Sequence, residues 1–101
     1  MKKKITVLAA ALLLTGCGGD NPYTPQAGAT AETIFAEACE SCHGANGAGK
    51  FGVLLRLALE DNSVEEVAAK VRSGGPVMPA FPQIDEATAT ALATHLKQVT
   101  Q

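Results

Sequence analysis

The stretch CESCH, residues 39–43, places two cysteines and a histidine within five positions of a chain that has three cysteines in all. Nearby cysteines serve disulfides, zinc sites, redox-active thiol pairs and covalently held haem. A disulfide between Cys39 and Cys42 closes too small a loop to constrain the unfolded chain much. A thioredoxin-like pair needs a βαβ context, which the sequence does not show. Zinc would need four ligands, with Cys39, Cys42, His43 and the distant His95 as candidates, but adjacent side chains on a helix diverge by about 100°.

The same divergence suits a covalently bound haem. In a C-x-x-C-H segment the two thiols form thioethers at the porphyrin edge, and the histidine ligates the iron. The motif therefore predicts one haem c, attached through Cys39 and Cys42, with His43 as an axial ligand.

The second axial ligand is predicted by elimination. Apart from the initiator, Met78 is the sole methionine, and it lies between Pro76 and Pro79 in a segment that suits neither a helix nor a sheet interior. A rigid loop of this kind is suited to hold a thioether in place. His95 is the rival, but it falls on a predicted helix, where a half-exposed histidine is ordinary. We expect Met78 to be the ligand.

The N-terminus has the pattern of an export signal. Three lysines at positions 2–4 precede an apolar run over residues 5–14, which is too short to span a bilayer. The ending Leu-Thr-Gly-Cys, residues 14–17, resembles the lipobox of bacterial lipoproteins. The pattern predicts a signal peptide over residues 1–16 and a lipidated Cys17.

Residues 17–29 are rich in glycine and proline, and we expect them to form a lipidated N-terminus and a flexible tether. The alternative is an ordered extension in which Tyr23 packs on the domain. Removal of residues 1–16 takes away three of the eight basic side chains and none of the ten acidic ones, leaving a formal charge of about −5. That balance argues against nucleic-acid binding, which needs clustered cations.

Residues 30–101 show helical patterns and no strand alternation. Thr30 is a candidate N-cap for a helix through about Cys42, Ser63 begins a capping box, and Asp85 is a candidate N-cap for the last helix. The leucine-rich residues 51–61 are expected to be helical for a turn or two. We predict a small all-α domain whose thin core needs a cofactor for stability.

These residues resemble the small class I c-type cytochromes. Phe35 stands four residues before the first haem cysteine, the motif precedes a glycine-rich turn, a Met78-Pro79 step follows, and a terminal helix closes the chain. The resemblance implies a cytochrome c-like fold of three to four helices wrapped around one haem. It also implies His43 and Met78 as axial ligands, and electron transfer as the activity.

The sequence departs from that family in three places. Ala31 replaces the glycine often found where the first and last helices cross, and His95 replaces an aromatic residue at the same crossing. No proline lies between the haem motif and Pro76, so we expect a backbone carbonyl near Gly52 or Val53 to accept the His43 imidazole proton.

We therefore expect a membrane-anchored, monomeric carrier of single electrons between respiratory redox proteins. It would be exported, held to a bacterial membrane through Cys17, and face the periplasm or the cell exterior. A Met/His-ligated iron has no open position, so we expect no enzymatic activity. Two alternatives stay open: a haem-based gas sensor with a displaceable Met78, and a fixed electron-donating subunit of a larger oxidoreductase.

Overall fold

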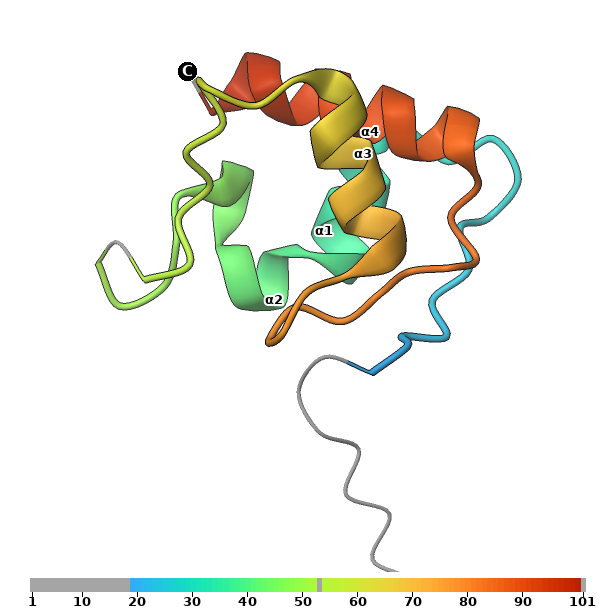
Figure 1. The fold of residues 1–101 in the computed structure, drawn as a ribbon, viewed down its shortest axis with the longest axis horizontal. Helices are drawn as coiled ribbons and strands as arrows, with labels where there is room; N and C mark the ends of the chain where they lie inside the picture. The colour runs from blue at the N-terminus through green and yellow to red at the C-terminus, as the bar shows by residue number, and fades with distance from the viewer. Residues whose placement is uncertain (1–18, 53, 101) are drawn as a thin grey trace, which may run out of the picture.

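The computed structural model describes residues 19–52 and 54–100, which form an all-α domain (Figure 1). The predicted signal peptide and Cys17 lie outside these residues. The described elements, in chain order, are α1 (Ala31–Ala38), α2 (Glu40–His43), the 3₁₀ turn η1 (Ala45–Gly47), α3 (Val64–Ser73) and α4 (Glu86–Val99). Within the described ranges no helix has the length and apolar character needed to cross a bilayer.

Each of the three longer helices begins at its predicted cap. The side chains of Thr30, Ser63 and Asp85 accept hydrogen bonds from the backbone N–H groups three residues later. The Ser63 capping box is complete, because the Glu66 side chain also accepts from the Ser63 N–H. The predicted first helix is interrupted at Cys39, whose backbone (φ −121°, ψ −32°) separates α1 from α2.

The core lies where α4 packs against both α1 and α3. Its largest fully buried side chains, Ile34, Ile84 and Leu92, come from α1, the loop before α4, and α4 itself. The remaining buried members of this cluster are Phe35, Cys39, Val67, Ala68, Val71, Phe81, Ala89, Ala93 and Leu96. The apolar sides of these helices therefore face one another, whereas Val99 at the end of α4 is 38% exposed.

The described residues of the leucine-rich segment, 51–52 and 54–61, are not helical, contrary to expectation. Lys50 and Leu54 exchange backbone hydrogen bonds around a tight turn, and Phe51 and Leu55 have left-handed φ angles of 50° and 59°. Leu54 and Leu55 are largely exposed. Because so little of these side chains is buried, local leucine content does not produce a helix here.

The expectation of a flexible tether is also wrong for residues 19–29, which we call the N-terminal strap. Asn21 N–H donates to the Ala80 carbonyl (2.7 Å), and Ala80 N–H donates to the Gly19 carbonyl (3.1 Å). Tyr23 packs against the core, and its hydroxyl donates to Glu37 on α1 (2.7 Å). The alternative of an ordered extension is confirmed for these residues, because tertiary contacts compensate for their weak local preferences. Figure 1 shows the strap running beside residues 74–82.

Candidate functional site

The interruption between α1 and α2 sets the positions of the two cysteines. Cys39 ends α1 and is buried, whereas Cys42, one turn later, is exposed. No disulfide joins them. Burial, with a smaller contribution from the nearby Cys42, raises the pKa of Cys39 to about 11. The pair therefore presents one inner and one outer sulfur on the same short helical turn.

His43 follows directly and has a fixed ring orientation. Its Nδ1 lies 2.7 Å from the backbone carbonyl oxygen of Leu55. Because a carbonyl only accepts, Nδ1 carries the proton and Nε2 keeps its lone pair for a metal. A backbone carbonyl accepts this proton, as expected, but it belongs to Leu55, which has a left-handed conformation and lies two residues beyond Val53.

The glycine after His43 returns the chain toward the imidazole. Gly44 has φ 76° and ψ 168°, and a Cβ there would collide with the backbone carbonyl of Gly49. Gly49 N–H donates to the His43 carbonyl (2.6 Å). This glycine therefore serves a close approach of two backbone segments, which brings the following turn and Leu55 near His43.

Met78 comes from a loop between α3 and α4, residues 74–82, which we call the methionine loop. Gly75 N–H donates to the Met78 carbonyl (2.9 Å), and Phe81 N–H donates to the Val71 carbonyl of α3 (3.0 Å). Met78 is half-buried and packs against the core cluster. The loop thus holds its thioether side chain at the edge of the core without regular secondary structure.

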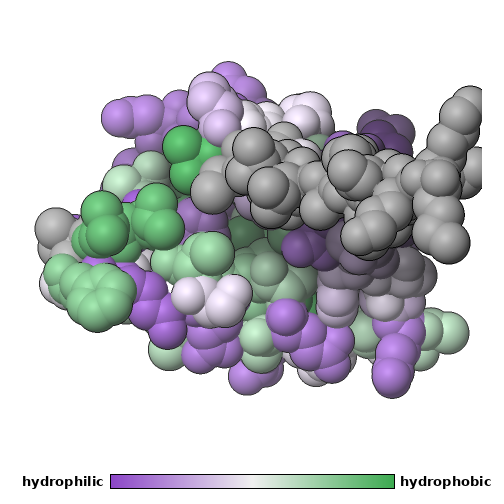
Figure 2. Space-filling view, turned by 90° about the horizontal axis from the view of Figure 1, so that it is seen from below, coloured by the Kyte–Doolittle hydropathy of each residue, from purple (hydrophilic) through white to green (hydrophobic). Residues whose placement is uncertain are grey.

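His43 and Met78 line the same hollow, which we call the apolar cleft. It has a volume of about 250 Å³ and is lined by Asn21, Ala38, Cys39, Ser41, Cys42, His43, Leu55, Val77, Met78, Pro79 and Phe81. Figure 2 shows part of this face as a central hydrophobic area, with further hydrophobic side chains projecting beside it. Since Cys42 and Val77 are exposed, the cleft opens to solvent there.

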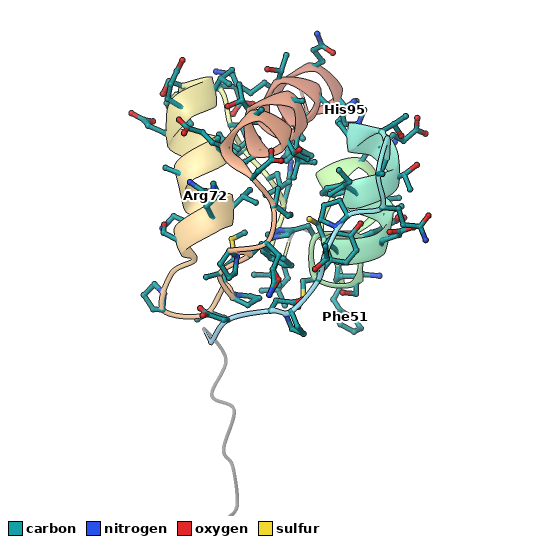
Figure 3. The ribbon with its side chains drawn as sticks, turned by 90° about the vertical axis from the view of Figure 1, so that its right-hand side faces the viewer. Phe51, Arg72 and His95 are labelled. Atoms are coloured by element: carbon teal, nitrogen blue, oxygen red, sulfur yellow. The ribbon has the colours of Figure 1, made fainter. Side chains whose placement is uncertain are left out.

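His95 does not belong to this lining. It lies half-exposed on α4, beside α1 (Figure 3). Among the described residues, no group of three or more His, Cys, Asp or Glu side chains is placed to hold a metal ion. The four ligands considered for zinc are therefore not brought together.

A larger groove of about 510 Å³ lies between α3 and α4, lined in part by Glu65, Arg72 and Glu86. Figure 3 shows Arg72 on α3, and its Nε donates to the Ile84 carbonyl (3.2 Å). The residues lining this groove include no cysteine, histidine or methionine. The two cysteines of the haem motif, His43 and Met78 all line the smaller apolar cleft instead.

The lining of the apolar cleft fits a haem. Two thiols at C-x-x-C spacing, an imidazole with a free Nε2 and a thioether share one cleft whose other members are mostly apolar. Cys39 and Cys42 would hold the ring edge and His43 would ligate the iron. Sequence reasoning did not include Asn21, Leu55 or Phe81 in this site, because each arrives through the tertiary fold and carries no local motif.

The family model described as "Cytochrome C oxidase, cbb3-type, subunit III" matches residues 26–96. The structure of OmcF, outer membrane cytochrome F from Geobacter sulfurreducens, is similar at 30% identity and a TM-score of 0.58, covering 70% of this chain and 99% of OmcF. Dihydro-haem d1 dehydrogenase NirN is similar at 32% identity and a TM-score of 0.56, covering 67% of this chain but 16% of NirN.

A third structure, the KustC0563 c-type cytochrome, shares the fold at 18% identity and a TM-score of 0.59, covering 72% of this chain and all of that one. No curated protein matches this chain significantly. The family match spans most of the described domain, and the donor set in the apolar cleft agrees with it. The chain therefore belongs to the cbb3-type cytochrome c family, as a small monohaem class I cytochrome with covalently bound haem c and the general role of an electron carrier.

Proposed function

We propose that this protein is an exported single-electron carrier, anchored to a bacterial membrane through a lipid on Cys17, with His43 and Met78 as axial ligands. One observation carries the proposal: an imidazole with an oriented ring and a thioether line the same apolar cleft. The bound haem supplies one-electron redox chemistry. Two protein ligands leave no open coordination position, which favours electron transfer over substrate chemistry.

The protein's own residues contribute orientation and exclusion of water. The Leu55 carbonyl fixes the His43 ring and increases the basicity of the ligating nitrogen. The methionine loop places Met78 at the edge of the buried core. A soft thioether favours the reduced iron, and burial raises the potential further.

A surface suited to transient partners surrounds the mouth of the cleft. Leu55 and Val77 line the cleft and are 45% and 67% exposed. Phe51 and Leu54, on the neighbouring turn, are 96% and 59% exposed, and Figure 3 shows Phe51 pointing away from the domain. A small apolar patch around the electron-transfer edge suits short-lived complexes with redox proteins.

The ordered strap changes how the anchored domain would sit. Its pairing with the methionine loop begins at Gly19, two residues after Cys17, and two residues span at most about 7 Å. A lipid on Cys17 would hold the domain at the membrane surface, with little freedom to swing. Electron donors and acceptors would then have to reach the cleft close to that surface.

A second candidate is a fixed electron-donating subunit, favoured by the description of the matched family as an oxidase subunit. Mild solubilisation of native membranes and sizing of the complex separates the two. Migration as a free small protein supports the mobile carrier, and stable co-migration with a large oxidoreductase supports the subunit.

Replacement of each candidate ligand tests the axial assignment. Met78→Ala should keep the haem attached, lower its redox potential and admit carbon monoxide. It should also remove the weak iron–methionine absorption band at the red end of the oxidised spectrum, which we call the red-end band. His95→Ala is the matched control and should change none of these properties. Loss of the low-spin spectrum in His95→Ala, with Met78→Ala unaffected, would reverse the assignment.

A further inference from the structure

The methionine loop is hydrogen-bonded to the N-terminal strap just after Met78. Ala80, two residues beyond Met78, is buried, and both of its backbone polar groups pair with the strap. Its N–H donates to the Gly19 carbonyl (3.1 Å), and its carbonyl accepts from the Asn21 N–H (2.7 Å). Asp20 and Ala80 thereby form a parallel bridge between segments about sixty residues apart.

The strap supplies hydrogen bonds to the methionine loop, which forms few such bonds within itself. Pro76, Pro79 and Pro82 have no backbone N–H to donate, so few hydrogen bonds hold the loop from within. Before Met78, Gly75 N–H donates to the Met78 carbonyl, and after it Phe81 N–H donates to the Val71 carbonyl of α3. Ala80 depends on the strap, because a buried backbone pair without partners is costly.

The strap is itself fixed to the helix that leads into the haem motif. The Asn21 side-chain oxygen accepts from Tyr23 N–H (2.9 Å), which shapes the strap locally. The Tyr23 hydroxyl donates to Glu37 (2.7 Å), two residues before Cys39. Asn21 also lines the apolar cleft. The strap therefore joins the methionine loop to α1, the helix that leads into the haem motif.

The geometry points to the first part of the strap, residues 19–23, as the element that positions Met78 toward the iron, with Asn21 as its positioning residue. This inference rests on the proposed axial role of Met78. When the strap pairs with Ala80, the loop is held in its ligating position. When the pairing is lost, the loop opens more often and Met78 leaves the iron more readily.

Asn21→Pro tests the role of the strap in the intact holoprotein, because proline lacks the backbone N–H that Asn21 donates to the Ala80 carbonyl. Ala27→Pro is the matched control, since it places a proline elsewhere in the strap, outside the cleft lining, at a residue whose N–H does not bond to the methionine loop. Loss of one such hydrogen bond corresponds to a factor of about 2 to 12 in an opening equilibrium. Carbon monoxide should bind to reduced Asn21→Pro faster by a factor in this range, the red-end band should weaken and the potential should fall, whereas Ala27→Pro should stay near wild type.

Tyr23→Ala provides a second variant if Asn21→Pro does not fold, because it removes the strap's contact with Glu37 and the core. It should shift the band and the carbon monoxide rate in the same direction. If both variants melt at lower temperature but keep the wild-type band, potential and carbon monoxide rate, the strap is merely structural and the inference is wrong. Met78→Ala separates this failure from that of the axial assignment: if it also leaves the band and rate unchanged, the proposed function has failed instead.

Discussion

Gly74 and Gly75 end α3 and begin the methionine loop. Replacement by alanine should lower the stability of the domain at Gly74 but leave it nearly unchanged at Gly75. Gly74 has φ 68° and ψ −168°, a region that only glycine adopts readily. A Cβ there would lie 2.6 Å from Ala80 N, 2.8 Å from Met78 O and 2.8 Å from Pro79 C. All three are backbone atoms of the ligand-bearing loop, so rotation of a side chain cannot relieve the overlap.

The size of the Gly74→Ala effect follows from two terms. The backbone conformation costs about 1–3 kcal/mol for a non-glycine residue, and overpacking against fixed atoms costs about 1–3 kcal/mol more. The two terms together cost about 2–6 kcal/mol, so with a urea m-value of about 1–3 kcal/mol/M for a small domain the unfolding midpoint should fall by roughly 2 M. Because the loop must shift, the iron–methionine band should weaken as well.

Gly75→Ala is the control in the neighbouring position. Its Cβ would meet only the end of the Lys70 side chain, at 3.3 Å from Nζ and 4.0 Å from Cδ, and that side chain is flexible. Its stability should stay within about 1 kcal/mol of wild type. Equal urea midpoints for the two variants, with the red-end band intact in both, would refute the claim that Gly74 permits close packing of the loop.

Burial, followed by the hydrogen bond and charge of Glu37, raises the pKa of Tyr23 from 10.0 to about 12. The contribution of the neutral Tyr23 hydroxyl to the stability of the fold is therefore complete below pH 10 and is lost as the pH rises through 12. Because the chain has one tyrosine, the tyrosinate absorbance of wild type minus Tyr23→Phe reports it, and a midpoint near 10 would contradict the packed strap. Cys17→Ser should release a soluble or uncleaved protein that still carries haem, and normal processing with retention in salt-washed membranes would contradict lipidation. The Cys39→Ala, Cys42→Ala double variant, expressed without haem, should be largely unfolded, since helices of 8, 4 and 10 residues are marginal alone. Native-like circular dichroism with a cooperative melt would show that haem is not needed for folding.

The helix starts could be predicted from the sequence because capping is local. A side chain at Thr30, Ser63 or Asp85 reaches an N–H three residues away, whatever the rest of the fold does. The haem motif is equally local, since its spacing alone puts two thiols and an imidazole on one helical turn. The residues that form each of these features lie within a few positions of one another, so the sequence alone is enough to recognise the feature.

The strap, the Leu55 carbonyl and the leucine-rich turn could not be predicted in this way. The strap is ordered by Ala80, about sixty residues later, and its composition alone favours disorder. Every residue has a backbone carbonyl, so no residue type marks Leu55 as the partner of His43. Leucine content suggested a helix at residues 51–61, but the return of the chain at Gly44 places this segment at the surface beside the cleft.

The most direct test of the account is the addition of carbon monoxide to the reduced wild-type holoprotein. If His43 and Met78 occupy both axial positions, binding should be slow or absent and the Soret band should stay in place on mixing. Met78→Ala, measured beside it, should bind at once. A fast Soret shift in the wild-type protein would contradict a closed electron carrier and indicate a ligand-binding haem protein.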